Sequence, residues 1–401
     1  MNFLNEQRKV PVLDRYDVVV CGGGFAGISA ALASARQGKR TLLLERQFML
    51  GGLATAGLVT IYLPLCDGMG HQVSFGIAEE LFKLSILHGA EARYPANWLD
   101  GVGARTEKDP RYEVQYNAQL FAILAERLLL DVGVDILYGA YAVGVDMEAD
   151  MIRHVIVESK SGRQAYGVCS VVDATGDCDI ARFANAPTCT FRQGNVPAGW
   201  YYSVGQEGYH LRMVGYSDIP DEEKTPERRA QDAGKPRFVG LEAEEISRFV
   251  QVSHDMTYEH FLKEREKDPT MLPVTLSTVP QLRMTRRICG EYELSNREEH
   301  TYFEDSVGMI SNWKKRGPIY EVPFRCLYSK QVKNLITAGR CVSVNEPMWD
   351  VMRVIPCCAV TGQAAGTAAA MTDDFSTLDV GTLQAQLRSD GVILHESELK
   401  A

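Results

Sequence analysis

The chain has 401 residues, of which 45% are apolar and 23% are charged, and its formal net charge is -10. A chain of this length buries a large core, and these proportions are ordinary for a folded globular protein. The negative charge excludes a general affinity for nucleic acid, which depends on basic surfaces, but a local cluster of arginines is still compatible with an anionic small substrate.

The first predicted unit, residues 16–46, has the pattern of a strand, a tight turn, a helix and a second strand. The apolar run from Tyr16 to Cys21 is typical of a parallel strand that is buried on both faces. An alanine-rich helix over 28–37 follows, and the second strand covers 40–45.

The turn of this unit carries three glycines, Gly22, Gly24 and Gly27, in the spacing G-x-G-x-x-G. The first permits the tight turn, the second lets the backbone approach a pyrophosphate, and the third lets the helix pack closely on the strand. Glu45 ends the second strand, where an acid accepts hydrogen bonds from a ribose 2′-OH. The unit therefore predicts a dinucleotide with an unphosphorylated ribose, as in FAD or NAD.

Further elements follow along the chain. A helix over 117–131 is indicated by apolar residues at helical spacing. Short strands are predicted over 135–139, 142–147, 152–159 and 167–173, with a hairpin turn at 161–162. Near the end come a strand over 334–338, a helix of small residues near 359–371 and a final helix near 382–388.

The sequence gives two indications of the compartment. The N-terminal segment 1–9 is polar overall and has no long apolar stretch, and no apolar run approaches the roughly 20 residues that cross a bilayer, so we expect a cytoplasmic protein. The ten cysteines contain no C-x-x-C pair, and a reducing compartment disfavours disulfides. We expect most of them to be small buried apolar residues, without a metal site.

Three segments beyond the glycine turn resemble glutathione-reductase-like flavoproteins. Residues 51–55 (G-G-L-A-T) resemble the G-G-x-x-T stretch of that group, and residues 174–177 resemble its A-T-G-D segment. Residues 335–340, followed by 353–356 and 362–366, resemble the C-terminal flavin-binding segment, whose last helix aims its N-terminus at the flavin ring. The resemblance implies that the dinucleotide is FAD.

The order of these segments, together with residues 280–292 and 322–327, resembles the FAD-dependent oxidoreductase family. That family includes the flavin subunit of heterodisulfide-reductase-like complexes, but no cysteine run for an iron–sulfur cluster is present here. The resemblance implies an α/β fold. A discontinuous Rossmann-type FAD-binding domain would comprise residues 1–64, 113–186 and 326–401, and an α+β substrate or cap domain would comprise 65–112 and 187–325.

The glycine turn and the resemblance together give the predicted FAD contacts. They are Gly22, Gly24, Phe25, Ala26, Gly27, Glu45, Arg46, Gly51, Gly52, Leu53, Thr55, Val143, Ala174, Thr175, Gly176, Gly339, Arg340, Arg353, Pro356, Thr361, Gly362 and Ala365.

Two kinds of residue are candidates for catalysis. Arg283, Arg286, Arg287 and Arg325 have the chemistry to clamp a carboxylate or a polarised carbonyl. The alternative is that these arginines pair with the glutamates at 291, 293, 298 or 299. His71, in a glycine-rich loop, is a candidate general base, and the alternative is a histidine on the surface.

Other candidates are less specific. Tyr292, Tyr302 and Tyr320 are possible proton donors, and no feature singles one out. Cys341 and the adjacent pair at 357–358 lie where the resemblance places the flavin ring. Redox activity and simple close packing both account for these cysteines.

The predicted function is hydride transfer between a small polar or carboxylated metabolite and flavin N5, in either direction. The alternative is a flavin-bearing scaffold that passes electrons to a partner protein, and a non-redox use of NAD is a third hypothesis. No second G-x-G-x-x-G follows another strand. We therefore expect electrons to be exchanged with the substrate, a transiently bound nicotinamide or a redox protein, with no nucleic-acid or membrane partner.

Overall fold

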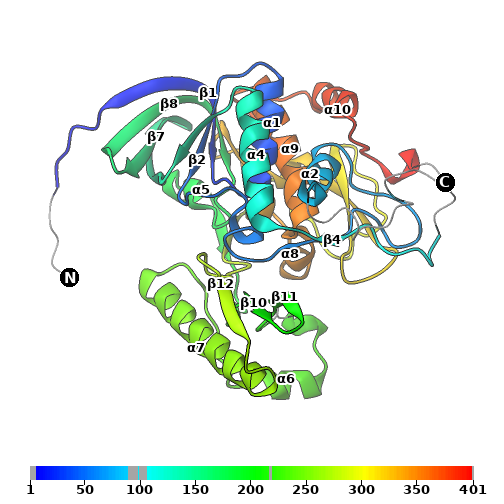
Figure 1. Ribbon diagram of the computed structural model, residues 1–401. Coiled ribbons are helices and arrows are strands. Elements are labelled where there is room, and N and C mark those ends of the chain that lie inside the picture. The colour runs from blue at the N-terminus through cyan, green and yellow to red at the C-terminus, as the bar shows by residue number, and fades with distance from the viewer. Residues whose placement is uncertain (1–5, 89–97, 99–105, 216–218, 400–401) are drawn as a thin grey trace.

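The computed structural model describes residues 6–88, 98, 106–215 and 219–399 (Figure 1). The predicted polar N-terminal segment and the predicted cap segment 65–112 therefore lie partly outside the described residues.

A seven-stranded mixed sheet forms the centre of the main body, in the order β5-β2-β1-β8-β7-β6, with β16 paired to β8. The pairs β1–β2, β1–β8, β2–β5 and β8–β16 are parallel, whereas β6–β7 and β7–β8 are antiparallel. The strands are β1 (Val12–Cys21), β2 (Thr41–Glu45), β5 (Asp135–Tyr138), β6 (Tyr141–Glu148), β7 (Met151–Ser159), β8 (Gly162–Asp173) and β16 (Leu335–Thr337).

The parallel strands at the centre of the sheet are the ones that the apolar runs predict. All five residues of β2 are buried, as are the last four of β1. Burial on both faces explains why these strands lack the alternation of a half-exposed strand.

Helices cover this sheet, and two of them are in very close contact (Figure 1). In α9 (Ile355–Met371), Gly362 and Gly366 lie against α1 (Phe25–Arg36). A Cβ added at Gly362 would be 2.2 Å from the carbonyl oxygen of Ala26, and one at Gly366 would be 2.1 Å from that of Ala30. Small residues one helical turn apart therefore set the spacing of the two helices. The other helices of the body are α2 (Ile77–Ile86), α4 (Ala118–Asp131), α5 (Asp179–Phe183), α8 (Glu346–Met352) and α10 (Val380–Ser389).

A smaller lobe projects from the body, and we call residues 191–285 the cap lobe (Figure 1). Its sheet has the order β11-β10-β12 and is antiparallel. Its elements are β10 (Tyr201–Gly205), β11 (Gly208–Arg212), β12 (Leu272–Leu276), α6 (Pro226–Asp232) and α7 (Ala243–Lys267).

The chain enters and leaves the cap lobe through one short ladder, formed by β9 (Thr188–Thr190) and β13 (Arg286–Ile288). At this neck, Cys189 and Cys289 form a disulfide, with their Cα atoms 6.2 Å apart. The expectation of no disulfide is therefore wrong for this pair. The two cysteines are 100 residues apart in sequence, and only the pairing of β9 with β13 brings them together. Six of the other cysteines are buried, as expected: Cys21, Cys66, Cys178, Cys326, Cys341 and Cys357.

Two further pairs of strands complete the body. The hairpin of β14 (Ser306–Ser311) and β15 (Ile319–Pro323) packs on α9, as does α2. The pair β3 (Ile61–Tyr62) and β4 (Val114–Gln115) lies in the same body. The predicted boundaries between an FAD-binding domain and a cap domain stay a prediction.

Among the described residues, no single helix is long and apolar enough to cross a membrane. Helices α8 and α9 reach that length and composition only as a pair, and the chain bends by 90° between them.

Candidate active site

A cavity of about 560 Å³ lies where β1, β2, β8 and β16 end. The body contributes the turn after β1 (21–26), the end of β2 with the residues after it (44–47), and residues 51–54. It also contributes residues 174–176 after β8 and residues 338–340 after β16. Ligands bind at this edge of open α/β sheets, because the strand ends and the helix N-termini converge there.

The glycine turn has the geometry of a dinucleotide cradle. Gly22 has φ 104°, and a Cβ at this position would be 2.4 Å from the carbonyl oxygen of Ala174. Gly27 lies against the carbonyl oxygen of Gly22, where a Cβ would be only 1.8 Å away. A Cβ at Gly24 would meet no atom within 4 Å, and no side chain caps the helix that begins after it. The first N–H groups of α1 are therefore open to an anion such as a pyrophosphate.

Glu45 connects this turn to the second strand. Its Oε2 accepts a hydrogen bond of 2.7 Å from the N–H of Gly23, and its Oε1 accepts one of 2.7 Å from the N–H of Gln47. The side chain is buried, and burial raises the pKa of its carboxyl above the usual value. Glu45 lines the cavity at the position that a ribose-binding acid occupies.

Residues 51–55 lie directly beside the glycine turn. The N–H of Gly51 donates a hydrogen bond of 2.7 Å to the carbonyl oxygen of Gly23, and Gly51 has φ 101°. Thr55 Oγ1 donates to the carbonyl oxygen of Leu50 at 2.5 Å. Thr55 thus supports the shape of this segment from behind, while Gly51, Gly52 and Leu53 line the cavity.

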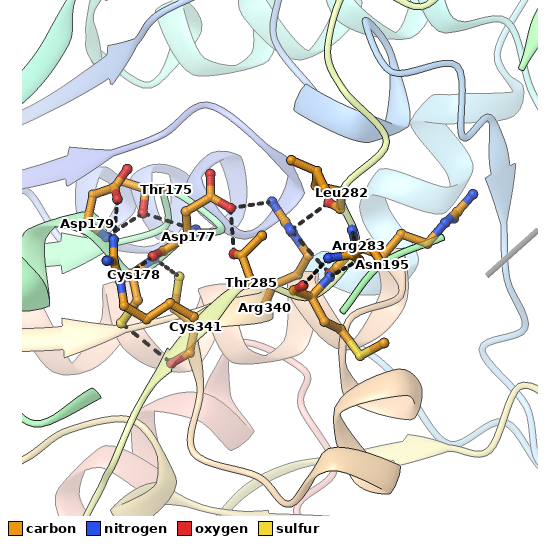
Figure 2. Close-up of polar contacts among 12 residues, drawn as sticks. Thr175, Asp177, Cys178, Asp179, Asn195, Leu282, Arg283, Thr285, Arg340 and Cys341 are labelled. Carbon is orange, nitrogen blue, oxygen red and sulfur yellow. Dashed lines mark hydrogen bonds and ion pairs between the residues drawn. The ribbon is translucent and has the colours of Figure 1, made fainter. Parts of the chain in front are cut away.

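Residues that are distant in sequence form another part of the cavity wall, and Figure 2 shows the polar contacts of one of them, Arg340. The Arg340 guanidinium donates to the carbonyl oxygens of Leu282 and Arg283 at 3.0 and 3.2 Å, and it lies 3.7 Å from Asp177. Gly176 makes room for it, because a Cβ there would be 2.2 Å from Arg340 Nη2. Arg340 thereby ties the body to the chain segment that returns from the cap lobe.

The structure brings most of the predicted cofactor residues to this cavity. Those that line it are Gly22, Gly24, Phe25, Ala26, Glu45, Arg46, Gly51, Gly52, Leu53, Ala174, Thr175, Gly176, Gly339, Arg340 and Arg353. Those outside the lining are Gly27, Thr55, Val143, Pro356, Thr361, Gly362 and Ala365. Residues of the second group can hold the lining residues in place without reaching the cavity themselves. Thr361 Oγ1, for example, accepts the N–H of Gly339 at 2.9 Å. Val143 does not line the cavity, but the three residues before it, 140–142, do.

Arg283 is the one of the four predicted substrate arginines that lines the cavity. Its guanidinium lies over the ring of Trp200, 5.1 Å from the centroid. Its Nη2 is buried, and the described part of the chain provides no hydrogen-bond partner for it. Burial, together with the positive charge of Arg353, lowers the pKa of Arg283 to about 9.

The backbone around Arg283 is held by a residue that the sequence does not single out. Asn195 Oδ1 accepts the N–H groups of Arg283 and Met284 at 2.9 and 3.1 Å, and its amide donates to the carbonyl oxygens of Met284 and Phe238. Figure 2 shows the Arg283 side chain extending away from the cluster around Asp177.

The other three arginines have acidic partners and lie outside the lining of the cavity. Arg286 donates to Asp179 Oδ1 at 2.6 Å, and Arg287 donates to Glu293 Oε2 at 2.5 Å. Arg325 pairs with Asp305 at 2.9 Å. Burial and the neighbouring carboxylates raise the pKa of Asp179 to about 6.

The predicted proton-transfer groups lie elsewhere. His71 Nδ1 is 2.8 Å from Asp67 Oδ2, and His71 is outside the cavity lining, as are Tyr292, Tyr302 and Tyr320. Of the three cysteines near the predicted flavin ring, Cys358 lines the cavity, and burial raises the pKa of its thiol to about 12. The thiol is therefore protonated at neutral pH. The described residues contain no group of three or more His, Cys, Asp or Glu that could hold a metal ion.

Several residues of the cavity wall have no counterpart in the sequence predictions. Trp200, Met213 and Val279 come from the cap lobe, and Trp313 comes from the loop between β14 and β15. No local spacing marks these side chains as neighbours, because more than 100 residues separate Trp200 from Trp313.

Behind Trp313 lies a buried cluster of charges. Asp350 accepts a hydrogen bond of 2.8 Å from Arg353 Nε and contacts Lys314 Nζ. Burial opposes ionisation of Asp350, but Arg353 and Lys314 outweigh it and hold the pKa of that carboxyl below its usual value.

Comparisons with known proteins agree with this geometry. The model of the family described as FAD dependent oxidoreductase matches residues 17–260 and 198–387. A stretch of 134 residues is 34% identical to the tRNA uridine 5-carboxymethylaminomethyl modification enzyme MnmG of Protochlamydia amoebophila (strain UWE25). That stretch is 31% of this chain and 21% of the relative, so the chain spans about a fifth of the relative's length.

Solved structures give weaker likenesses. A geranylgeranyl bacteriochlorophyll reductase-like protein from Thermoplasma acidophilum is 14% identical, with 94% of this chain and 83% of that chain covered and a TM-score of 0.47. The p-nitrophenol 4-monooxygenase of Pseudomonas putida DLL-E4 is 12% identical, with 95% and 81% covered and a TM-score of 0.43. Likenesses of this degree support no conclusion about chemistry. The family match covers most of the chain, and the protein therefore belongs to the FAD dependent oxidoreductase family, as an enzyme that uses FAD.

Proposed function

We propose that the enzyme transfers a hydride between a small carboxylated metabolite and flavin N5. The observation that carries the proposal is Arg283, a buried arginine in the wall of the same cavity whose other end is the dinucleotide cradle. A buried guanidinium without an acidic partner is costly, and an anionic ligand removes that cost.

The described residues fit FAD. The open N–H groups after Gly24 suit a pyrophosphate, and Glu45 suits a ribose hydroxyl. Val354 and Ile355, at the N-terminus of α9, line the cavity, and no side chain caps that helix. A helix N-terminus stabilises nearby negative charge by about 0.3–1 kcal/mol, which suits the ring of a reduced flavin. When bound, FAD supplies the centre that accepts or donates the hydride.

The protein's own residues then have two roles. Arg283 binds and orients the carboxylate, so that the reacting carbon is held in one position. The apolar side chains around it exclude water from the reacting centre. The Cys358 thiol keeps its proton at neutral pH, which is not the state of a nucleophilic cysteine.

The alternative of a flavin-bearing scaffold, like the flavin subunit of heterodisulfide-reductase-like complexes, has less support. A scaffold needs no side chains directed at a substrate, whereas Arg283, Trp200 and Val279 of the cap lobe line the same cavity as the dinucleotide cradle. We propose that a nicotinamide or a redox protein completes the second half of the reaction.

The test is a visible absorption spectrum of the purified protein before and after anaerobic addition of candidate metabolites. Flavin bands that survive gel filtration and bleach with a carboxylated metabolite are the expected result. Bleaching that is lost in Arg283→Met and kept in the matched control Arg325→Met would assign the role to Arg283. Bands that only dithionite bleaches would favour the scaffold.

A further inference from the structure

The cavity wall combines the buried Arg283 with a group of apolar side chains. Those side chains are Trp200, Trp313, Ile61, Leu63, Met213 and Val279. This composition limits the chemical class of the substrate more than membership of the family does.

The charges beside the cavity indicate how many anionic groups the ligand carries. Arg353 also lines the cavity, and it pairs with Asp350. Lys314 contacts Asp350 as well and lies 3.7 Å from Glu223, so these two cations face two carboxylates. Arg283 has no ion pair with any acid in the described part of the chain. One cation at this end of the cavity is therefore without a matching carboxylate, and one carboxylate on the ligand would match it.

The apolar part of the wall indicates the shape of the ligand. Arg283 lies over the ring of Trp200, and this cation–π contact holds the guanidinium. Two indole side chains line the cavity, and aromatic rings pack against one another, edge to face or offset, more favourably than their area alone predicts. A second carboxylate or a row of hydroxyls would instead be buried against apolar side chains, without partners.

We infer that the substrate is a monocarboxylate with a flat, aromatic body, bound with its carboxylate on Arg283 and its ring against Trp200 and Trp313. The inference rests on the proposed function and narrows its substrate class.

The first test uses the FAD-loaded enzyme and four probes: benzoate, 2-naphthoate, benzamide and succinate. Binding is measured by the change in the visible flavin spectrum and by calorimetry, so no turnover is needed. We expect saturable binding of benzoate, tighter binding of 2-naphthoate, and binding at least tenfold weaker for benzamide and succinate. Benzamide or succinate binding as tightly as benzoate would overturn the inference.

The second test uses variants. Arg283→Met is expected to weaken benzoate binding at least tenfold with little change for benzamide, and Arg283→Lys is expected to fall between. The matched control is Arg325→Met, which removes an arginine outside the cavity and should leave benzoate binding unchanged. Trp200→Leu should weaken 2-naphthoate more than benzoate.

The outcomes separate this inference from the proposed function. If Arg283→Met lowers FAD retention but leaves benzoate affinity within twofold, the arginine serves the cofactor and the inference fails. If a variant does not fold, the probe series on the unaltered enzyme still decides. Benzoate binding to a flavin that no metabolite bleaches would refute the proposed function alone, whereas bleaching by an aliphatic carboxylate, with no binding of benzoate, would refute the inference alone.

Discussion

The backbone N–H of Gly23 donates a 2.7 Å hydrogen bond to Oε2 of Glu45, and the N–H of Gln47 donates to the other oxygen of the same carboxylate. A residue at the end of β2 therefore fixes the glycine turn at the end of β1. Glu45 holds the shape of the cradle as well as being placed to bind a ribose.

Replacing Glu45 with alanine should weaken FAD binding about 10- to 100-fold. Hydrogen bonds to a charged group are worth about 1.5–3 kcal/mol, and the variant loses those of the turn and of the ribose. The measurement is a fluorescence titration of the apoprotein with FAD. Glu158→Ala is the control, because Glu158 pairs with Arg163 on the surface. A dissociation constant within twofold of the original would contradict this role.

The contact between α1 and α9 leads to a second prediction. Gly366→Ala should lower the free energy of unfolding by about 1–3 kcal/mol, because the added Cβ would lie 2.1 Å from the carbonyl oxygen of Ala30 and would force the helices apart. Denaturant unfolding measures the effect. The control is Gly381→Ala in α10, where the nearest atom is 3.6 Å from an added Cβ. Equal stability of Gly366→Ala and this control would contradict the close packing.

Much of the main body follows from local sequence. The apolar runs and the glycine spacing indicate β1, α1 and β2. A strand that is buried on both faces requires a continuous apolar run, and the tight turn requires glycines. The small residues near 359–371 likewise indicate a helix that packs closely against a neighbouring helix.

The elements of the cap lobe are harder to predict from the sequence. Helix α7 has 25 residues but buries only Phe249, Ser253 and Thr257, so its inner face is narrow and partly polar. A stripe of that kind barely differs from a solvated segment in the sequence.

The sequence also does not show which of the four candidate arginines lines the cavity. Arg286 and Arg287 lie on β13 and meet Asp179 and Glu293, whereas Arg283 precedes that strand and is positioned by Asn195, 88 residues away. Spacing along the chain does not reveal which side chain a distant residue turns toward a cavity. Only the folded structure distinguishes the four.

The disulfide at the neck of the cap lobe gives a third prediction. The double variant Cys189→Ser, Cys289→Ser should lose about 2–5 kcal/mol of stability, because the bond restricts the unfolded chain between residues 100 apart. Denaturant unfolding with and without dithiothreitol measures it. The reductant should destabilise the original protein and leave the variant unchanged. Sensitivity of the variant to the reductant would show that the effect arises elsewhere.

The last prediction concerns the pH dependence of anion binding at Arg283. Burial and the charge of Arg353 lower the pKa of this guanidinium to about 9, so it loses its proton at a lower pH than an exposed arginine. The protonated form attracts a carboxylate and the neutral form does not. Benzoate, whose own charge is constant above pH 6, should therefore bind equally well from pH 6 to 8 and less well as the pH rises through about 9.

A bound carboxylate favours the protonated guanidinium, so proton and ligand each strengthen the binding of the other. Calorimetric titrations of the FAD-loaded enzyme between pH 6 and 10 measure this dependence, with benzamide as the uncharged comparison. Benzamide affinity should not follow the same curve. Benzoate affinity that stays level to pH 10 would mean that Arg283 keeps its charge or does not contact the carboxylate. The Arg283→Met variant separates these two cases, because only in the first does the substitution weaken benzoate binding at pH 7.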